Sequence, residues 1–367
     1  MTKVNRYHWT SAILSISRWR SAKGSPDLRF PPKSGDSNRT ILRLPILISA
    51  ILSLLLLLLA ASGCRPAATP VERHEREYAR LADEMPPLSP VPLGEGEKLQ
   101  VIATTSIVAD VVKNIGGDLI DLTTLIPPGS DPHTFEPTPR DAAAVAKAHV
   151  VFINGAGLEQ FLEPLLESVG GTEKITSVSY GIELRRLDGE HGQADPHVWF
   201  DPYNVIVWTH NIEQALGALD PDNASAYTAR ARAYEAELRE LDAWIRDQVA
   251  QVPAANRKLL TDHKVLGYFA DRYGFEQVGT VIPGLSTLAQ PSAQELTALE
   301  DIIRRHNVKA IFVGTTVNPR LAQQIADDTG ASLVFLYTGS LSEPNGPADS
   351  YLSLMRYDVA AIVEALK

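Results

Sequence analysis

Short apolar runs alternate with longer amphipathic segments along the chain from Lys98 onward. Apolar runs bounded by Gly, Pro or Ser predict strands, and apolar residues that recur every three or four positions predict helices. In the first half of this region we expect strands at 99–105, 119–126, 149–155 and 174–179, and helices at 106–116, 140–148, 157–169 and 203–219. Strands that alternate with helices in this way are typical of a parallel sheet covered by helices.

The second half begins with the longest uninterrupted helical pattern, which runs from Asn223 to Val252 and ends at Pro253. Beyond it we expect strands at 257–262, 275–282, 308–314 and 331–337, and helices at 264–274, 292–307, 318–330 and 348–366. The pattern predicts an α/β protein of two lobes, each a mostly parallel sheet flanked by helices, joined by one long rigid helix. The predicted boundaries are 98–220 for the N-terminal lobe, 221–252 for the connecting helix and 253–367 for the C-terminal lobe.

The chain before the lobes has a different composition. Residues 1–63 hold nine of the 34 Lys and Arg residues but only two of the 44 Asp and Glu residues. They lead through the apolar run "ILISAILSLLLLLLAASGC" to Cys64, the only cysteine of the chain. This run resembles a bacterial lipobox, so we interpret 1–63 as an N-terminal extension and lipoprotein signal peptide, and Cys64 as the lipidation site. The alternative is an uncleaved membrane anchor, and both interpretations place the lobes outside the cytoplasm.

Residues 64–97 are rich in proline and charged side chains and predict a disordered tether. The formal net charge of the whole chain is −10, and most of the acidic residues lie in the lobes. An acidic body disfavours nucleic acid as a partner and favours cations in its vicinity. With a single cysteine, no internal disulfide is expected.

Two similar loops carry candidate metal ligands. The segments "GSDPHTFEP" and "ADPHVWFDP" each place a histidine, His133 and His197, directly after Asp-Pro, and His263 follows the expected strand 257–262. Ligands of α/β sheets bind beyond the carboxyl ends of the strands, and neutral imidazole is a good ligand for zinc and several other divalent metals. Proline stiffens each loop, so that the imidazole is held in place before a metal arrives. A lone histidine of this kind would more simply be a polar residue with no metal role.

A fourth ligand is expected to be an oxygen donor from the C-terminal lobe. Glu343 and Asp349 follow its last expected strand, although Asp349 is equally placed to be the N-cap of the final helix. His191, in the short polar loop "DGEHGQA", is a candidate auxiliary metal contact, with a solvated loop as the alternative.

Several segments together resemble those of a known family, the metal-binding solute-binding lipoproteins of ABC importers for zinc and manganese. The resemblance covers nearly all of 98–367 and rests on "PPGSDPHTFEPTPRD", "DPHVWFDPYN", "DHKVLGYFADRYG", "PSAQEL" and "NGPADSYLSLMRYD". It implies two lobes joined by one long helix, with the metal buried between them. It also implies a ligand set of His133, His197, His263 and Asp349. Gly314 departs from the pattern, because many members carry an acidic residue there.

The resulting hypothesis is a monomeric, lipid-anchored protein of the periplasm or cell surface that is not an enzyme. It would bind Zn²⁺, or alternatively Mn²⁺, and pass it to an ABC permease. Three nitrogens and one carboxylate suit tetrahedral zinc, and four protein ligands leave no open position for catalysis. The alternatives are a secreted zinc metallohydrolase, for which no HExxH cluster is present, and a surface adhesion protein stabilised by metal.

Overall fold

The computed structural model describes residues 87–159, 161, 165, 172–187 and 193–367. Its N-terminal lobe contains the strands β1 (Leu99–Ala103), β2 (Ile120–Thr124), β3 (Val150–Ile153) and β4 (Ile175–Ser177). The helices of this lobe are α3 (Ser106–Gly116), α4 (Pro139–Lys147) and α6 (Pro202–Leu219), with short 3-10 turns η2 (Thr172–Lys174) and η3 (Val198–Phe200). The described strands and helices agree with those expected from the sequence to within a few residues at each end.

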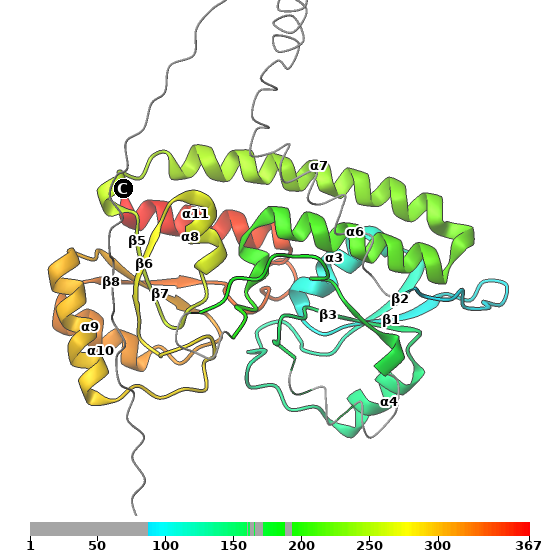
Figure 1. Ribbon diagram of the computed structural model, residues 1–367, viewed down its shortest axis with the longest axis horizontal. Helices are drawn as coiled ribbons and strands as arrows, with labels where there is room; N and C mark the ends of the chain where they lie inside the picture. Colours follow the sequence, from blue (N-terminus) through cyan, green and yellow to red (C-terminus); the bar gives the residue numbers. More distant parts are fainter. Residues whose placement is uncertain (1–86, 160, 162–164, 166–171, 188–192) are drawn as a thin grey trace, which may run out of the picture. The chain divides into compact units, whose positions relative to one another are not determined.

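The four strands of this lobe form one parallel sheet in the order β2-β1-β3-β4. The central strands β1 and β3 are almost entirely buried, because helices pack on the faces of the sheet (Figure 1). The chain passes from β1 to β2 on one side and then crosses to β3 on the other side, so the strand order reverses between β1 and β3. Open parallel sheets bind ligands beyond the carboxyl ends of the strands at such a reversal.

The C-terminal lobe repeats this design. It contains β5 (Lys258–Thr261), β6 (Glu276–Thr280), β7 (Ala310–Gly314) and β8 (Ser332–Leu336), with the helices α8 (Gly267–Tyr273), α9 (Ala293–His306), α10 (Arg320–Thr329) and α11 (Tyr351–Leu366). The strands are again parallel, in the order β6-β5-β7-β8. The prediction of two mostly parallel sheets flanked by helices is therefore confirmed.

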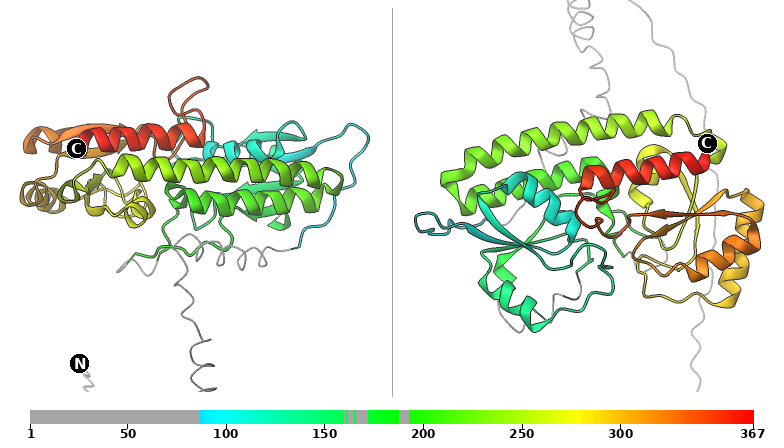
Figure 2. Two further views of the ribbon diagram at one scale, coloured as in Figure 1. Left: turned by 90° about the horizontal axis from the view of Figure 1, so that it is seen from above. Right: turned by 180° about the vertical axis from the view of Figure 1, so that it is seen from behind.

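The connecting helix α7 (Ala224–Val249) runs along both lobes, beside α6 and α11 (Figures 1 and 2). It is shorter than the predicted 221–252, because η4 (Pro221–Asn223) forms a separate 3-10 turn before it and the chain turns again at η5 (Ala254–Asn256) after Pro253. Its buried side chains recur at helical spacing, including Tyr227, Tyr234, Leu238 and Leu241, and they pack toward the neighbouring helices.

The two lobes share one hydrophobic core. They are therefore not two separately packed bodies joined only by the connecting helix. The largest cluster of buried apolar residues includes Phe152 of β3, Trp208 of α6, Leu238 of α7, Phe312 of β7 and Tyr351 of α11. The helix α11 belongs to the C-terminal lobe in sequence, but it also packs against α3 and α7. A predicted boundary at residue 253 therefore separates the sheets but does not divide the core.

Ordered structure begins before Lys98, within the segment predicted to be a disordered tether. The backbone N–H of Val91 donates to the carbonyl of Leu219 at 2.9 Å, and Leu88, Val91 and Leu93 pack against the large core. These apolar side chains fall among prolines, and their burial at the C-terminal end of α6 outweighs the local preference for disorder.

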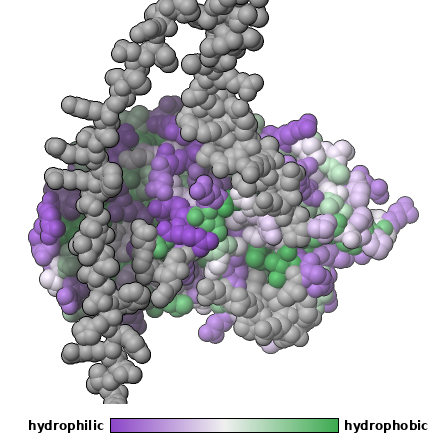
Figure 3. All heavy atoms as spheres, viewed as in Figure 1, coloured by the Kyte–Doolittle hydropathy of each residue, from purple (hydrophilic) through white to green (hydrophobic). Residues whose placement is uncertain are grey.

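Several sequence predictions lie outside the described residues. They are the signal peptide within 1–63, the lipidation site Cys64, His191, and most of the expected helix at 157–169. Among the helices that are described, none combines the length and the apolar character that a membrane crossing requires. Polar residues dominate the described part of the face in Figure 3, with smaller apolar patches between them.

A buried ion-pair group joins α8 of the C-terminal lobe to α6 and α7. Arg272 Nε lies 3.0 Å from Asp201 Oδ1 and 2.8 Å from Asp242 Oδ1, and its guanidinium stacks 4.0 Å from the ring centre of Tyr203. Only 10% of the Arg272 side chain is exposed. Removing the guanidinium would take the shared counter-charge from both carboxylates, although Asp242 would keep its ion pair with Arg246 at 3.0 Å.

We therefore expect Arg272→Ala to lower the free energy of unfolding by about 3–5 kcal/mol, measured by urea denaturation of the metal-free protein. The matched control is Arg304→Ala on α9, which breaks an ion pair with Glu300 at 2.8 Å whose arginine is 52% exposed. An exposed pair of this kind contributes less than about 1 kcal/mol. Equal effects of the two substitutions would contradict a structural role for the Arg272 group.

A buried carboxyl group supports the end of strand β8. Asp358 of α11 is 2% exposed, and its Oδ1 accepts a hydrogen bond from the backbone N–H of Tyr337 at 2.8 Å. Its Oδ2 has no partner within the described part of the chain. Burial raises the pKa of Asp358 to about 8, so the folded protein keeps this group protonated.

Because the folded state holds a proton that the unfolded chain releases above pH of about 4, stability should fall as pH rises toward 8. One such group contributes a slope of roughly 1.4 kcal/mol per pH unit. We expect Asp358→Asn, which keeps the acceptor for Tyr337, to flatten the dependence of the unfolding free energy on pH between 5 and 8. An unchanged slope in urea unfolding would assign the pH dependence to other groups.

Candidate metal centre

His133 lies in the loop that follows β2, and the aspartate before it fixes the loop. The backbone N–H of His133 donates to Asp131 Oδ1 at 2.9 Å, which forms a tight local turn around Pro132. The other oxygen of Asp131 accepts a hydrogen bond from the hydroxyl of Thr287 at 2.6 Å. Since Thr287 belongs to the C-terminal lobe, this carboxylate connects the His133 loop to the opposite lobe.

His197 lies in the loop that follows β4, immediately before η3. Asp195 Oδ1 lies 3.1 Å from the backbone nitrogen of His197 and 2.8 Å from its Nδ1. The side chain of Asn154, at the end of β3, donates to the carbonyl of Pro196 at 3.0 Å. The second Asp-Pro-His loop is thus held both by its own aspartate and by the neighbouring strand.

His263 follows β5 with one aspartate between them. Asp262 Oδ1 lies 2.7 Å from Nδ1 of His263, and Asp262 Oδ2 accepts the backbone N–H of Gly314 at 2.7 Å. A side chain at position 314 would place its Cβ 2.2 Å from the hydroxyl of Thr338 and 3.2 Å from Asp262 Oδ2. This close approach explains the glycine that departs from the family pattern.

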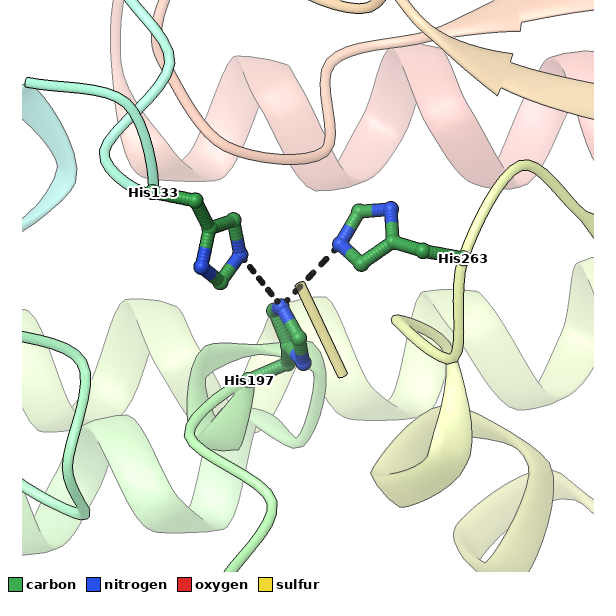
Figure 4. Close-up of side chains that lie close together, drawn as sticks. All are labelled: His133, His197 and His263. Carbon is green, nitrogen blue, oxygen red and sulfur yellow. Dashed lines mark hydrogen bonds between the residues drawn. The ribbon is translucent and has the colours of Figure 1, made fainter. Parts of the chain in front are cut away.

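The three imidazoles converge through their Nε2 atoms (Figure 4). Nε2 of His197 lies 3.3 Å from Nε2 of His133 and 3.2 Å from Nε2 of His263. Two nitrogens bound to one zinc at about 2.0–2.1 Å, at the tetrahedral angle, would be separated by about 3.3–3.4 Å. The spacing therefore suits three ligands of a single metal ion.

The aspartates also determine which nitrogen faces the centre. When Nδ1–H of His197 and of His263 donates a hydrogen bond to its carboxylate, the lone pair of each imidazole lies on Nε2, where a metal would bind. His197 and His263 are 1% and 3% exposed, whereas His133 is half-buried. The centre is thus closed on the side of His197 and His263 and more open on the side of His133.

Electrostatics keep the centre in its metal-binding form. Burial, followed by the proximity of His197 and His263, lowers the pKa of His133 to about 2. Burial also lowers the pKa of His197, although the Asp195 carboxylate opposes this shift. Neutral imidazoles are the form that binds a metal ion, so no proton has to be displaced from these two residues near neutral pH.

A network around Asp195 connects the centre to the C-terminal lobe. The guanidinium of Arg185 donates to Asp195 Oδ2 at 3.0 Å and to Asp271 Oδ2 at 2.6 Å, and Asp271 lies on α8. The hydroxyl of Tyr268, also on α8, donates to the carbonyl of Asp195 at 3.0 Å. The aspartate that orients His197 is therefore itself held by the helix that follows His263.

Among the described residues, the structure does not place Asp349, the predicted fourth ligand, with the three converging imidazoles. Asp349 is exposed, and its carboxylate accepts bonds from the backbone N–H of Asn345 at 3.2 Å and from the hydroxyl of Ser353 at 3.3 Å. Asp349 is not the N-cap of α11 either, because Ser350 takes that position. Glu343, the other candidate, is also exposed.

Sequence reasoning missed the orienting role of Asp195 and Asp262. The signal was present, since each histidine of the centre follows an aspartate by one or two positions. The stiffness of proline is only part of the role of these loops, because Asp195 bonds the imidazole of His197 and Asp131 bonds the backbone of His133.

Three histidines that converge from the strand ends of two lobes could hold one metal ion, which fits a metal-binding solute-binding protein. The chain matches the family model of ZnuA, the periplasmic component A of a zinc-uptake complex, over residues 101–365, and it belongs to this family. It is a binding component and not an enzyme, as predicted from the sequence.

The names of similar proteins refer to different metals, namely manganese, iron and zinc. The manganese-binding lipoprotein MntA of Halalkalibacterium halodurans is 34% identical over 273 residues, which cover 74% of this chain and 90% of MntA. The iron-binding protein YfeA of Yersinia pestis is 31% identical over 275 residues, which cover 74% and 88% of the two chains. The structure of the periplasmic zinc-binding protein TroA of Treponema pallidum matches with a TM-score of 0.67 and 28% identity, over 73% of this chain and 99% of TroA.

We expect Asp195→Asn to weaken zinc binding by about 10–100-fold, because the amide would no longer hold Nδ1–H of His197 as a charged acceptor. The measurement is competition against a chelator of known affinity, with the thermal unfolding of both proteins checked first. The matched control is Asp349→Asn, an exposed aspartate outside the centre, for which we expect unchanged affinity. Wild-type affinity in Asp195→Asn would show that the carboxylate does not orient the ligand.

Proposed function

We propose that this protein captures a divalent transition metal ion outside the cytoplasm and delivers it to the permease of an ABC importer. The observation that carries this proposal is the convergence of three imidazoles from both lobes, with Nε2 of His197 lying 3.3 Å from Nε2 of His133 and 3.2 Å from Nε2 of His263. Binding at the junction of two lobes suits a carrier, because separation of the lobes would release the ion.

The proposed ligands are His133 and His197 from the N-terminal lobe and His263 from the C-terminal lobe. Zinc is the favoured cargo, because imidazole nitrogens at this spacing suit a tetrahedral zinc ion, while manganese prefers oxygen donors. Manganese is the second candidate, and it is supported by the names of relatives such as MntA. The measured ratio of the two affinities would decide between them.

The proposed location is the outer side of a bacterial membrane, with the protein anchored through lipid on Cys64. The support is the lipobox-like sequence before Cys64 and the description of the relative MntA as a lipoprotein. We further propose that the protein acts as a monomer that docks on its permease.

We expect calorimetric titration of the metal-stripped protein with Zn²⁺ to show one tight site. His133→Ala, His197→Ala and His263→Ala should each weaken it by at least about 100-fold, because each removes one nitrogen ligand and leaves a shallower site. His306→Ala, a histidine at the end of α9 outside the centre, is the control and should bind as the wild type does.

Parallel titrations with Mn²⁺ give the cargo preference. Weak binding at several sites that is indifferent to the three histidine substitutions would refute the metal-capture proposal. Tight binding at the centre, combined with normal metal uptake in cells that lack this protein, would instead refute its role in delivery.

A further inference from the structure

The N-terminal lobe buries a carboxyl group, Glu159, that the capture of metal by the three histidines does not use. Glu159 is 7% exposed. Burial raises the pKa of Glu159 to about 7, although the hydrogen bonds that its carboxylate accepts oppose this rise. A buried carboxyl group whose pKa is shifted in this way, close to the strand ends where a ligand binds, is a candidate for a functional role.

Glu159 joins the ends of two neighbouring strands. Its Oε1 accepts a hydrogen bond from the hydroxyl of Thr104, which follows β1, at 2.7 Å, and one from the backbone N–H of Asn154, which follows β3, at 2.6 Å. Its Oε2 accepts from the backbone N–H of Gly155 at 3.0 Å. All three donors are uncharged. They lie at the carboxyl ends of β1 and β3, where the strand order reverses and where open sheets bind ligands.

The turn after β3 has an unusual backbone. Gly155, Ala156 and Gly157 have φ angles of 81°, 53° and 85°. A positive φ is unfavourable for a residue with a Cβ, such as Ala156. A Cβ at Gly155 would also lie 2.1 Å from the hydroxyl oxygen of Ser177 on β4. The carboxylate of Glu159 therefore holds the start of a turn that the chain does not adopt easily.

Asn154 connects this turn to the loop of a metal ligand. Its side-chain amide donates to the carbonyl of Gly155 at 2.8 Å and to the carbonyl of Pro196 at 3.0 Å. Pro196 immediately precedes His197, and the Asn154 side chain is fully buried. A series of hydrogen bonds thus runs from Glu159 through Asn154 to the peptide group before His197.

We propose that Glu159, acting through Asn154, is a positioning residue that holds His197 in the orientation in which it binds the metal ion. This inference rests on the proposed function. The ionised carboxylate accepts hydrogen bonds from all three donors around it. Protonation turns one of its acceptor sites into a donor, so at least one of these bonds is lost. The loop of His197 is therefore held best when Glu159 is ionised.

The zinc affinity should consequently depend on the ionisation of Glu159. Because the pKa of Glu159 is about 7, its carboxyl group is mostly ionised at about pH 8 and mostly protonated at about pH 6. Metal binding favours the ionised form, so this contribution to the affinity is present above the pKa and is lost as pH falls through it.

The test is the zinc affinity of Glu159→Gln, measured by chelator competition at about pH 8 and at about pH 6. Gln has the shape of Glu and resembles the protonated carboxyl group. At the higher pH we expect zinc binding about tenfold weaker than in the wild type, a usual loss for a residue that supports a metal ligand. At the lower pH the two affinities should be nearly equal. The histidines are the same in both proteins, so their own titration cancels in the ratio.

Equal affinities at the higher pH would show that Glu159 does not position His197. A loss of the same size at both pH values would show that the ionised carboxylate is not what supports the site. Either result would overturn the inference.

Asn154→Ala tests the route from Glu159 to His197. We expect it to weaken zinc binding to a similar degree, and we expect Glu159→Gln to add little in the double variant, because both substitutions break one series of contacts. Independent, additive losses would overturn the inference. The urea unfolding of each metal-free variant is measured first, so that the affinities refer to folded protein.

Asp358→Asn is the matched control, because it changes a buried carboxyl group of the other lobe that also accepts a backbone N–H. We expect its zinc affinity to equal that of the wild type at both pH values. A comparable loss in this variant would attribute the effect of Glu159→Gln to general destabilisation and overturn the inference.

Failure of the proposed function gives a different result. Wild-type protein without a tight zinc site, or with a site that His197→Ala leaves unchanged, would reject metal capture itself. A tight site that depends on His197 but not on Glu159 would reject only the positioning role.

Discussion

The hydrogen bond between an aspartate carboxylate and Nδ1–H of a histidine is the interaction on which this centre depends. At Asp195–His197 and Asp262–His263 it fixes the tautomer, turns the lone pair of Nε2 inward and holds the ring against rotation. Each carboxylate also has a second partner, Arg185 in one case and the backbone of Gly314 in the other. The orientation of an imidazole is thereby connected to the packing of α8 and β7, well beyond the loop that carries it.

The parallel sheets explain why these loops meet. In each lobe the carboxyl ends of the strands lie on one edge, and the histidines follow β2, β4 and β5. The helices α6, α7 and α11 join both sheets in one hydrophobic core, so the two edges are held by shared packing and not by the loops alone. Gly314 allows Asp262 and Thr338 to approach the backbone closely, and Gly339 does the same for Pro132, the residue before His133.

The distribution of charge suits a protein that must both hold a cation and release it. Burial lowers the pKa of His133 and of His197, and the carboxylates of Asp195 and Asp262 lie one hydrogen bond behind the imidazoles of His197 and His263. Arg185 offsets part of that charge, and it does so from a position that touches both lobes. The carboxylates around the site therefore attract a cation, while the groups that face the centre are imidazole nitrogens.

The sequence by itself determined the order and type of the secondary structure, because alternating apolar runs record which segments are buried between helices. It also identified the three histidines, because each follows a strand end or a proline-stiffened turn. Tertiary structure alone decided the shared core, the packing of Leu88–Leu93 and the hydrogen-bond partners of Asp349. The spacing of apolar residues indicates which face of one helix or strand is buried. The partners of a loop carboxylate depend instead on how the folded chain packs around it. In this structure Asn345 and Ser353 donate hydrogen bonds to Asp349. The orienting aspartates were visible as neighbours of the histidines, but only the folded chain showed that their oxygens are bonded to the imidazoles, to Arg185 and to Gly314.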